Sequence, residues 1–512
     1  MMGISDITGP MTPFEATQAG QKLLFVECTH TYHNAVQSGI QRVVRNILRH
    51  AGEVAAERGY VMVPVVFEAG QFRAADLSRV LNDKLRPLET GSRLERMQAS
   101  FRAWRALGGR QKVLAAGLPV YRGLRRAVAT VLPFEPVHRF LYAHSRSFGL
   151  GWCLALPVWT LRDVKRRFSK PVAVVIVPAA PGDGFGFSMD AMGEHAGNVL
   201  LLLDSSWQLD LWSAVVRFQA KGGTTWSVIY DLIPITHPET GVSLINNDYY
   251  LWMRGQLKVS RRFAAISRTV AAQLDGYLTD LTRNEMPPMP WTVKSFYLGS
   301  ELDFVDPDLS PRPEIRAMFE GGAHVFIVVG SIEPRKNHSF ILDAFDLYWK
   351  QGGTARLVII GRHGWKNDVV LARMRRHAMA GKRLFVCRDM GDSELNFAYL
   401  NASALIIASE AEGFGLPIVE AFQRGLPVLC SDIAVFREIA DGKAAFFSLS
   451  GPSCLTEAVV AFCAERDVTH RRERHPQPWL TWRDSTAALL GVVLEPCVQR
   501  NDGIDSAGTN SD

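Results

Sequence analysis

Two glutamates eight positions apart, Glu412 and Glu420, frame the clearest chemical signal in this 512-residue sequence. The segment that holds them follows the apolar run LIIAS and leads into the helical pattern PIVEAFQRG. In open α/β sheets, ligands bind just past the carboxyl ends of the strands, and a helix that begins there offers free N–H groups to a phosphate. We therefore expect binding by the residues that follow the first glutamate, which are Gly413, Phe414, Gly415 and Leu416.

The two carboxylates restrict what this ligand can be. Carboxylates repel phosphate, so a glutamate pair is out of place in a site for a simple anion. The pair fits a ligand that carries hydroxyl groups on either side of a diphosphate. Gly413 and Gly415 would let backbone amides approach such a ligand closely, and Pro417 suits the first position of the helix.

A basic pair, Arg335 and Lys336, directly follows another predicted strand, HVFIVVG. Guanidinium and ammonium groups are the usual counter-charges for phosphate. Because the carboxyl ends of parallel strands lie at one edge of a sheet, we expect this pair to lie near Glu412. Arg335, Lys336 and Glu412 are therefore candidate residues of one site at this edge of the sheet.

Alternating strand and helix patterns predict an α/β protein with two Rossmann-like domains. The predicted strands are 23–28, 60–68, 172–177, 199–204, 226–234 and 263–267 in the first half, and 324–330, 356–361, 383–389, 405–409 and 426–431 in the second. A stretch rich in proline and aspartate, 299–320, resembles a linker. We predict an N-terminal domain over 1–300, a C-terminal domain over 301–475, a last helix over 476–498 and a disordered tail over 499–512.

A basic segment interrupts the first domain over about 82–170. Between Arg86 and Arg146 it has twelve basic and three acidic residues, whereas the whole chain has a net charge of +6. Apolar residues at helical spacing indicate an inserted helical segment. It is interpreted either as solvated helices that cover the sheet or as an interfacial helix on anionic lipid. Nucleic acid is disfavoured as a partner because no reader motif accompanies the charge.

Composition excludes several other classes of protein. Hydrophobic residues make up 47% and charged residues 21% of the chain, which is typical of a soluble globular protein. The seven scattered cysteines form no C-x-x-C motif, so reduced thiols are expected rather than a disulfide framework or a zinc site. The N-terminal segment does not resemble a signal peptide, and no long apolar run is present. We expect a cytoplasmic protein, with peripheral contact to the inner face of the membrane as an option.

The C-terminal half resembles the large retaining glycosyltransferase family 4, which has the two-domain GT-B fold. The family's E-x7-E pattern matches Glu412 and Glu420 within EGFGLPIVEA, and its basic phosphate-binding loop matches EPRKN. On the acceptor side, SGIQRVVRNIL, which contains Gly39, resembles the family's glycine-bearing loop and helix. YDLIPITHPE, which contains Asp231, resembles the H-D-L segment of bacterial polysaccharide mannosyl- and rhamnosyltransferases. Tyr230 stands where those enzymes commonly have histidine.

The resemblance implies two Rossmann-like domains that face each other across a cleft, and a role for each site residue. Glu420 would hold the ribose hydroxyls of a nucleotide-diphosphate sugar. Glu412 and the amides of 413–416 would hold the transferred hexose, and Arg335 and Lys336 would neutralise the departing diphosphate. The acceptor would be a glycan or a lipid-linked glycan, and mannose or rhamnose is the expected sugar. The family retains anomeric configuration and usually needs neither a metal nor another cofactor.

Two rival functions belong to other classes. A nucleotide-sugar epimerase of similar fold would bind the same donor but would need no acceptor. A non-catalytic partner in polysaccharide assembly could have kept the fold alone. The intact set of Glu412, Glu420, Arg335 and Lys336 argues against the second rival, because fold by itself does not imply function.

Overall fold

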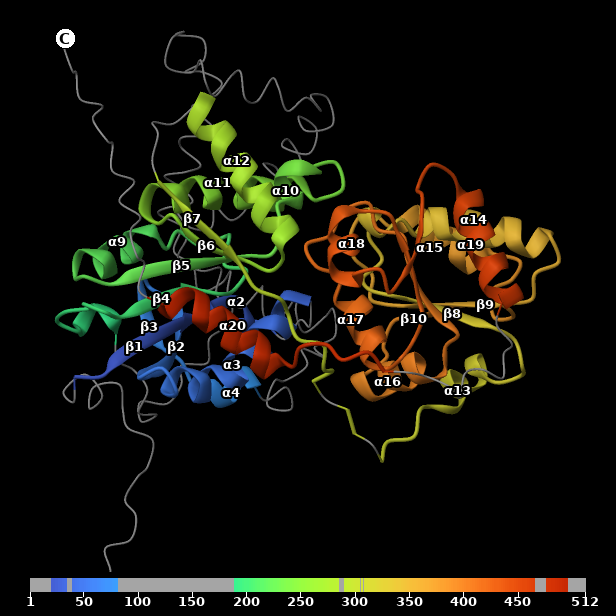
Figure 1. The fold of residues 1–512 in the computed structure, drawn as a ribbon, viewed down its shortest axis with the longest axis horizontal. Coiled ribbons are helices and arrows are strands. Elements are labelled where there is room, and N and C mark those ends of the chain that lie inside the picture. Colours follow the sequence, from blue (N-terminus) through green and yellow to red (C-terminus); the bar gives the residue numbers. More distant parts are fainter. Residues whose placement is uncertain are drawn as a thin grey trace, which may run out of the picture. The chain divides into compact units, whose positions relative to one another are not determined.

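The computed structural model describes residues 20–34, 39–81, 188–284, 290–303, 305–306, 308–465 and 476–495. All of its elements belong to one compact unit (Figure 1). The predicted basic insert over about 82–170, the predicted strand 172–177 and the predicted tail 499–512 lie outside the described residues. Among the described residues, no helix is both long and apolar enough to cross a membrane.

The first sheet has seven strands in the order β3-β2-β1-β4-β5-β6-β7. Every neighbouring pair is parallel except β2 and β3, which form a hairpin. The strands are β1 Lys22–Glu27, β2 Tyr60–Glu68, β3 Gln71–Ala74, β4 Val199–Leu202, β5 Thr224–Ile229, β6 Arg262–Ala265 and β7 Thr292–Ser295. The helices among them are α2 Thr29–His33, α3 Gly39–Ala56, α4 Leu77–Leu81, η2 Met189–Ala191, α9 Trp212–Ala220, α10 Ile233–Thr236, α11 Ser243–Val259 and α12 Arg268–Asn284.

The second sheet has six parallel strands in the order β10-β9-β8-β11-β12-β13. The strands are β8 Val325–Val329, β9 Arg356–Ile360, β10 Leu384–Cys387, β11 Ala404–Ile407, β12 Val428–Ser431 and β13 Ala445–Phe447. The helices are α13 Pro313–Phe319, η3 Pro334–Lys336, α14 His338–Lys350, α15 Asp368–Arg376, α16 Asp392–Asn401, α17 Leu416–Gln423, α18 Ala434–Ala440 and α19 Pro452–Glu465. The two sheets confirm the prediction of two Rossmann-like domains.

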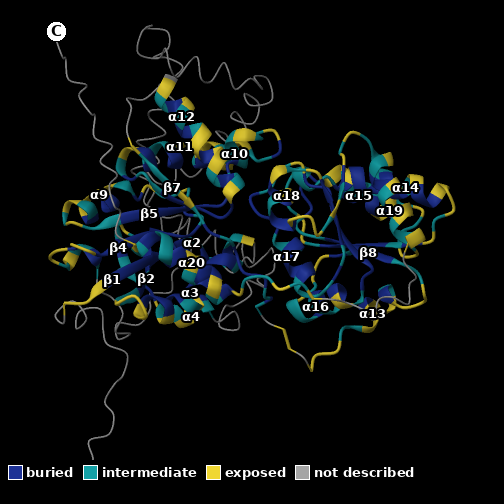
Figure 2. Ribbon diagram, in the orientation of Figure 1, coloured by how far each residue is buried: buried dark blue, intermediate teal, exposed yellow. Residues whose placement is uncertain are grey.

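Both sheets are covered on both faces, as their uninterrupted apolar strands require. In β1, Leu24 and Val26 join a core that includes α3, whereas Leu23 and Phe25 join a core that includes α9. The strands of the second sheet divide their side chains in the same way, between α16–α18 on one face and α14 with α19 on the other. Figure 2 shows both sheets as buried layers beneath helices whose outer sides are exposed.

Three short strands, β3, β7 and β13, were not predicted from the sequence. β3 follows a tight turn in which Ala69 and Gly70 both have positive φ, and a run of four residues gave too short a pattern to predict. β7 and β13 are also short, with four and three residues respectively. At the start of α16, Gly391 is the cap residue and Asp392 lies in the first turn. That position favours a carboxylate because the helix dipole is positive there.

The last helix, α20 Trp482–Leu494, returns to the first domain and packs against α3. It begins with a capping box in which Thr481 and Asp484 bind each other's backbone N–H groups. Trp482 is 2% exposed, and its indole N–H donates to the carbonyl of Glu301 at 3.0 Å. A Cβ on Gly299 would lie 2.6 Å from the Trp482 nitrogen, so the chain between the domains needs glycine at this point.

Trp482 is therefore expected to hold α20 against the chain between the domains. We predict that Trp482→Ala lowers the free energy of unfolding by about 3–5 kcal/mol, the usual cost of truncating a buried aromatic side chain. Denaturant melts of the two proteins measure the change. The control Val369→Ala, at a side chain that is 86% exposed, should change stability by less than about 0.5 kcal/mol. An equal effect of the two substitutions would contradict the packing described here.

Candidate active site

The candidate site lies at the switch point of the second sheet. Strand order runs outward in opposite directions from the neighbouring strands β8 and β11, and loops at such a point leave room for a ligand. Arg335 and Lys336 follow β8, and Glu412 follows β11. The predicted meeting of these two loops is observed, because the nitrogen of Glu410 donates to the carbonyl of Arg335 at 2.9 Å.

Glu412 is bound by both predicted basic residues. Arg335 Nη1 lies 2.7 Å from Glu412 Oε2, and Lys336 Nζ forms an ion pair with Glu412 Oε1. The second guanidinium nitrogen of Arg335 lies 2.9 Å from Glu333 Oε1. Ser409 adds a hydroxyl that donates to Glu412 Oε1 at 3.0 Å. Two acidic and two basic side chains thus neutralise one another within a single cluster.

The charges in this cluster set the protonation state of Glu412. Burial alone would raise the pKa of its carboxyl, but Arg335 and Lys336 outweigh burial and lower that pKa to about 2. Burial opposes the charge of Arg335 as well, yet Glu412, Glu333 and Asp231 raise its pKa above the ordinary value. A diphosphate that entered here would find two charged donors, and it would compete with Glu412 for them.

The glycines of the loop after β11 serve the packing of the two domains. A Cβ on Gly413 would lie 2.0 Å from the carbonyl oxygen of Tyr230, so only glycine lets this loop approach the end of β5. Ser267, at the end of β6, donates its hydroxyl to the Gly413 carbonyl at 2.9 Å. Gly415 has a φ of 100° and precedes α17 as its cap residue. The expected close approach to a ligand stays a prediction, whereas the close approach to β5 is observed.

Phe414 and Leu416 support the loop from behind. Phe414 is 3% exposed and packs against Tyr297 and Trp479, with ring centroids 6.2 and 6.1 Å apart. Leu416 is half-buried against the same core. Any contact of Phe414 with a ligand would therefore be made by its backbone. Gly39, the first residue of α3, lies beside this loop, since a Cβ there would be 4.0 Å from a methyl group of Leu416.

Asp231 lies next to the cluster from the side of the first domain. It follows β5, its Oδ1 accepts a hydrogen bond from the nitrogen of Ile233 at 3.0 Å, and its Cβ is 3.2 Å from where a Cβ on Gly413 would be. Burial raises the pKa of Asp231, and Glu412 raises it further, while Arg335 lowers it. Tyr230 points away, because its buried hydroxyl donates to the carbonyl of Leu203 at 2.7 Å. Tyr230 therefore does not take the place of a histidine at this site.

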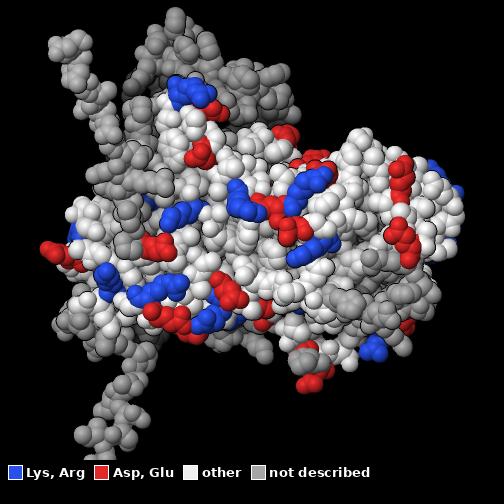
Figure 3. Space-filling view, in the orientation of Figure 1, with Lys and Arg blue, Asp and Glu red and all other residues white. Residues whose placement is uncertain are grey.

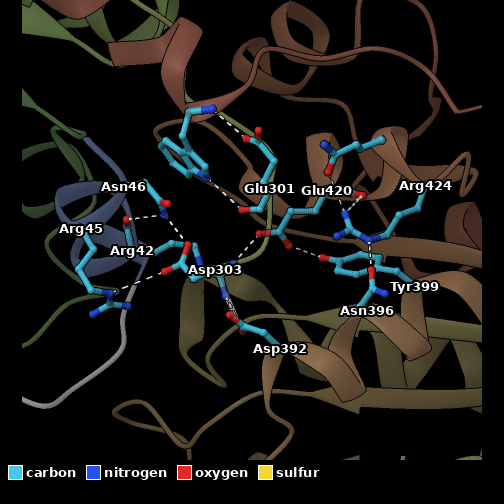
Figure 4. A network of polar contacts seen from close by, with 12 residues as sticks. Arg42, Arg45, Asn46, Glu301, Asp303, Asp392, Asn396, Tyr399, Glu420 and Arg424 are labelled. Carbon is cyan, nitrogen blue, oxygen red and sulfur yellow. Dashed lines mark hydrogen bonds and ion pairs between the residues drawn. The ribbon is translucent and has the colours of Figure 1, made fainter. Parts of the chain in front are cut away.

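Glu420 lies one turn into α17 and is 2% exposed (Figure 4). Arg42 Nη1, from α3 of the first domain, lies 2.6 Å from Glu420 Oε1. The hydroxyl of Tyr399, from α16, donates to Glu420 Oε2 at 2.6 Å. Sequence reasoning did not single out Arg42 or Tyr399. The available signal for Arg42 was its place three residues after Gly39, in a segment that had already been assigned to the acceptor side.

A second pair of carboxyl groups, Glu27 and Asp204, lies at the switch point of the first sheet: Glu27 is the last residue of β1, and Asp204 follows β4. Burial first, and then the charge of Asp204, raise the pKa of Glu27 to about 7. The pair accepts hydrogen bonds from the nitrogens of Thr29 and Thr31, at 2.8 and 2.5 Å. Sequence reasoning missed Glu27, because it lies inside the first apolar strand. The pair holds α2 against the sheet.

Acidic and basic side chains are interspersed on the face that Figure 3 shows. Among the described residues on that face, no large patch of one sign stands out. The strongly basic stretch 86–146 lies outside the described residues, so contact with anionic lipid stays a prediction.

Part of the second domain matches a known protein family. Residues 315–451 match the family described as glycosyl transferases group 1. The chain is 33% identical over 302 residues to the serotype-specific mannosyltransferase WbdA of Escherichia coli, which covers 57% of this chain and 36% of that protein. It is 34% identical over 117 residues to the O-antigen chain mannosyltransferase B of Escherichia coli, covering 22% of this chain and 30% of the relative. The chain thus spans about a third of the length of the curated relatives it matches.

Solved structures with similar folds include two proteins at 12% identity. One is the Anabaena protein HepE in complex with UDP and glucose, with a TM-score of 0.44 and coverage of 93% of this chain and 96% of that one. The other is a sucrose-phosphate synthase of Thermosynechococcus elongatus, with a TM-score of 0.45 and coverage of 93% and 95%. The family match and the two Rossmann-like sheets confirm the expected glycosyltransferase resemblance and the GT-B fold class. The part of the second domain over 315–451 is similar to group 1 glycosyltransferases.

The depressed pKa of Glu412 predicts how its contribution to stability depends on pH. The folded-state pKa of about 2 lies below the ordinary value of 4.5, so the stabilisation is complete above about pH 4.5 and is lost as the pH falls toward 2. Glu412→Gln removes the titrating carboxyl. The midpoint of thermal unfolding should therefore fall more steeply with acidity in the natural protein than in this variant.

Thermal melts between about pH 6 and pH 3 measure this difference. The control Glu320→Gln replaces an exposed carboxylate and should follow the natural protein across the range. A gap between the natural protein and Glu412→Gln that stays constant with pH would contradict the assigned ion pairs.

Proposed function

We propose that this chain transfers a hexose from a nucleotide-diphosphate sugar to a glycan or lipid-linked glycan, with retention of anomeric configuration, in the synthesis of a bacterial surface polysaccharide. The observation that carries the proposal is the binding of Glu412 by Arg335 and Lys336 at the switch point of a group 1 glycosyltransferase domain. The similarity to mannosyltransferases favours mannose over rhamnose as the sugar.

The charges of the cluster suit the bond that has to break. Cleavage of a glycosyl–phosphate bond leaves negative charge on the diphosphate and positive charge on the sugar ring. As the diphosphate enters, Arg335 and Lys336 would turn from Glu412 to its oxygens and stabilise the developing negative charge. The carboxylate of Glu412 is then released to accept hydrogen bonds from sugar hydroxyls beside the positive ring. No metal is required for this division of charge.

The acceptor would approach from the first domain. Asp231 lies beside Glu412 there, and its proposed role is to bind the acceptor hydroxyl that attacks the sugar. Gly39 is placed at the same junction and would leave room for the acceptor or the donor. Work at the inner face of the cytoplasmic membrane would bring a lipid-linked acceptor within reach.

A donor screen tests the proposal. The full chain is incubated with GDP-mannose, dTDP-rhamnose or UDP-glucose in the presence of EDTA, and release of the nucleoside diphosphate is measured with and without a mannose oligosaccharide. Release from GDP-mannose that the oligosaccharide accelerates is expected. Conversion of a nucleotide sugar into its epimer without an acceptor would support the epimerase instead, and no turnover of any donor would reject the proposal.

Three alanine variants test the roles within the site. Lys336→Ala and Glu412→Ala each remove a group that meets charge in the transition state, so each should lower kcat by roughly 100- to 1000-fold. Glu420→Ala removes a contact to the ribose, which does not change during the reaction. Its main effect should be a higher KM for the donor.

Steady-state kinetics on the active donor measure these effects, and thermal melts show that each variant is folded. Lys350→Ala is the matched control, since Lys350 is exposed at the end of α14. The assignment of the site is wrong if folded Glu412→Ala and Lys336→Ala keep a kcat near that of the control.

A further inference from the structure

The carboxylate of Glu420 is held from both domains at once. Arg42 from the first domain occupies Oε1, and Tyr399 from the second occupies Oε2, each at 2.6 Å. An ionised carboxylate has about four sites for hydrogen bonds, two on each oxygen. Each oxygen therefore keeps the capacity for one further hydrogen bond, and the two fixed partners set the direction of that bond.

Arg42 also supplies the charge that this carboxylate needs. The side chain of Glu420 is only 3% exposed, and a carboxylate at that depth is costly unless it is paired. Arg42 reaches a second acidic group with its other nitrogen, which lies 3.2 Å from Asp392 Oδ1. Burial would lower the pKa of Arg42, but Glu420, Asp392 and Asp303 raise it above its ordinary value, so the guanidinium keeps its charge.

Contacts with Asp303 hold the part of α3 that carries Arg42 in place (Figure 4). Asn46, one turn further along α3, donates to the Arg42 carbonyl at 2.9 Å and also to Asp303 in the chain between the domains. Arg45 lies 3.7 Å from the other oxygen of Asp303. This helix therefore presents Arg42 to Glu420 from a fixed position.

We propose that Arg42 is a positioning residue for the donor. It orients Glu420 and neutralises it, so that a buried carboxylate can bind the ribose hydroxyls beside a negatively charged diphosphate. This inference rests on the proposed function and extends it, because it makes the first domain part of the nucleoside end of the donor site. Glu420 is ready for the ribose only while α3 is in contact with the second domain.

Binding of nucleotides separates this role from a merely structural one. Isothermal titration is carried out with GDP and UDP, and with their 2′,3′-dideoxy counterparts, which lack the hydroxyls that Glu420 would bind. The proteins are the natural chain, Arg42→Met, Arg42→Lys and Glu420→Gln. Arg483→Met is the matched control, because Arg483 pairs with Glu53 and Glu57 near the end of α3 and does not touch Glu420.

Arg42→Met is expected to weaken binding of the preferred ribonucleotide by about 10- to 100-fold, the range for losing a charge-assisted hydrogen bond. It should change binding of the dideoxynucleotide by less than about threefold. Adding Arg42→Met to Glu420→Gln should cause little further loss, because both changes act through one carboxylate. Arg42→Lys keeps the positive charge but lacks the two parallel N–H donors of the guanidinium. Its loss of affinity should therefore be smaller and again confined to the ribonucleotide.

Several results would overturn the proposal. If Arg42→Met weakens binding of ribo- and dideoxynucleotides equally, the substitution has a general effect on the fold. If its loss of affinity is no larger than that of Arg483→Met, Arg42 has no role in binding the nucleotide. Tighter binding by Arg42→Met would mean that the ion pair competes with the donor. If Arg42→Met does not fold, Arg42→Lys decides by the same comparison. If the natural chain binds neither GDP nor UDP, the proposed function itself is rejected. If the natural chain binds a nucleotide and substitution of Arg42 does not change that binding, only this inference is rejected.

Discussion

Two carboxylates, Glu412 and Glu420, are taken out of water where the two domains meet, and each must have a cationic partner there. A buried carboxylate without one is strongly destabilising, because the charge loses its hydration. Glu412 is paired by Arg335 and Lys336 within its own domain, whereas Glu420 is paired by Arg42 of the other domain. Both the local structure of the loops and the contact between the domains depend on meeting this requirement.

The topology of the two sheets brings the cationic partners close to Glu412 and Glu420. β8 and β11 are neighbours at the switch point of the second sheet, so the loops that carry Arg335 and Glu412 begin side by side. In the first sheet the switch point lies between β1 and β4, and α3 is the helix that connects β1 to β2. Arg42 on that helix reaches Glu420 because the carboxyl ends of β5 and β6 contact the loop of Gly413. Each sheet thus contributes its ligand-binding edge to one junction.

Charge balance also resolves an apparent conflict in the sequence. Carboxylates beside a diphosphate site would repel the ligand if they were free. In the structure, Glu412 and Glu420 each come with their own counter-charge, so a diphosphate does not meet two unpaired anions. In the proposed function, Arg335 and Lys336 would be exchanged between Glu412 and the diphosphate. That exchange would couple the entry of the donor to the release of the Glu412 carboxylate for the sugar.

Sequence reasoning succeeded where a motif and its strand lie close together in the chain. Arg335, Lys336 and Glu412 could be predicted to meet because each directly follows a strongly apolar strand of one parallel sheet. Arg42 and Tyr399 could not be linked to Glu420, since their contacts join elements 378 and 21 residues away. The contact of Arg42 depends on how helices pack across the domain boundary, and that of Tyr399 on how two helices of the second domain pack, which periodicity does not report. The role of Gly413 could not be predicted either. A side chain is excluded at this position by the carbonyl of Tyr230, which is distant in the sequence.

The most direct test of this account is a crystal structure of the chain with a bound nucleotide sugar that cannot be turned over. The account predicts that the β-phosphate oxygens lie within hydrogen-bond distance of Arg335 and Lys336. It also predicts that the ribose hydroxyls bind Glu420 and that Arg42 stays paired with the Glu420 carboxylate. A nucleotide bound elsewhere, with both basic residues still paired to Glu412, would contradict it.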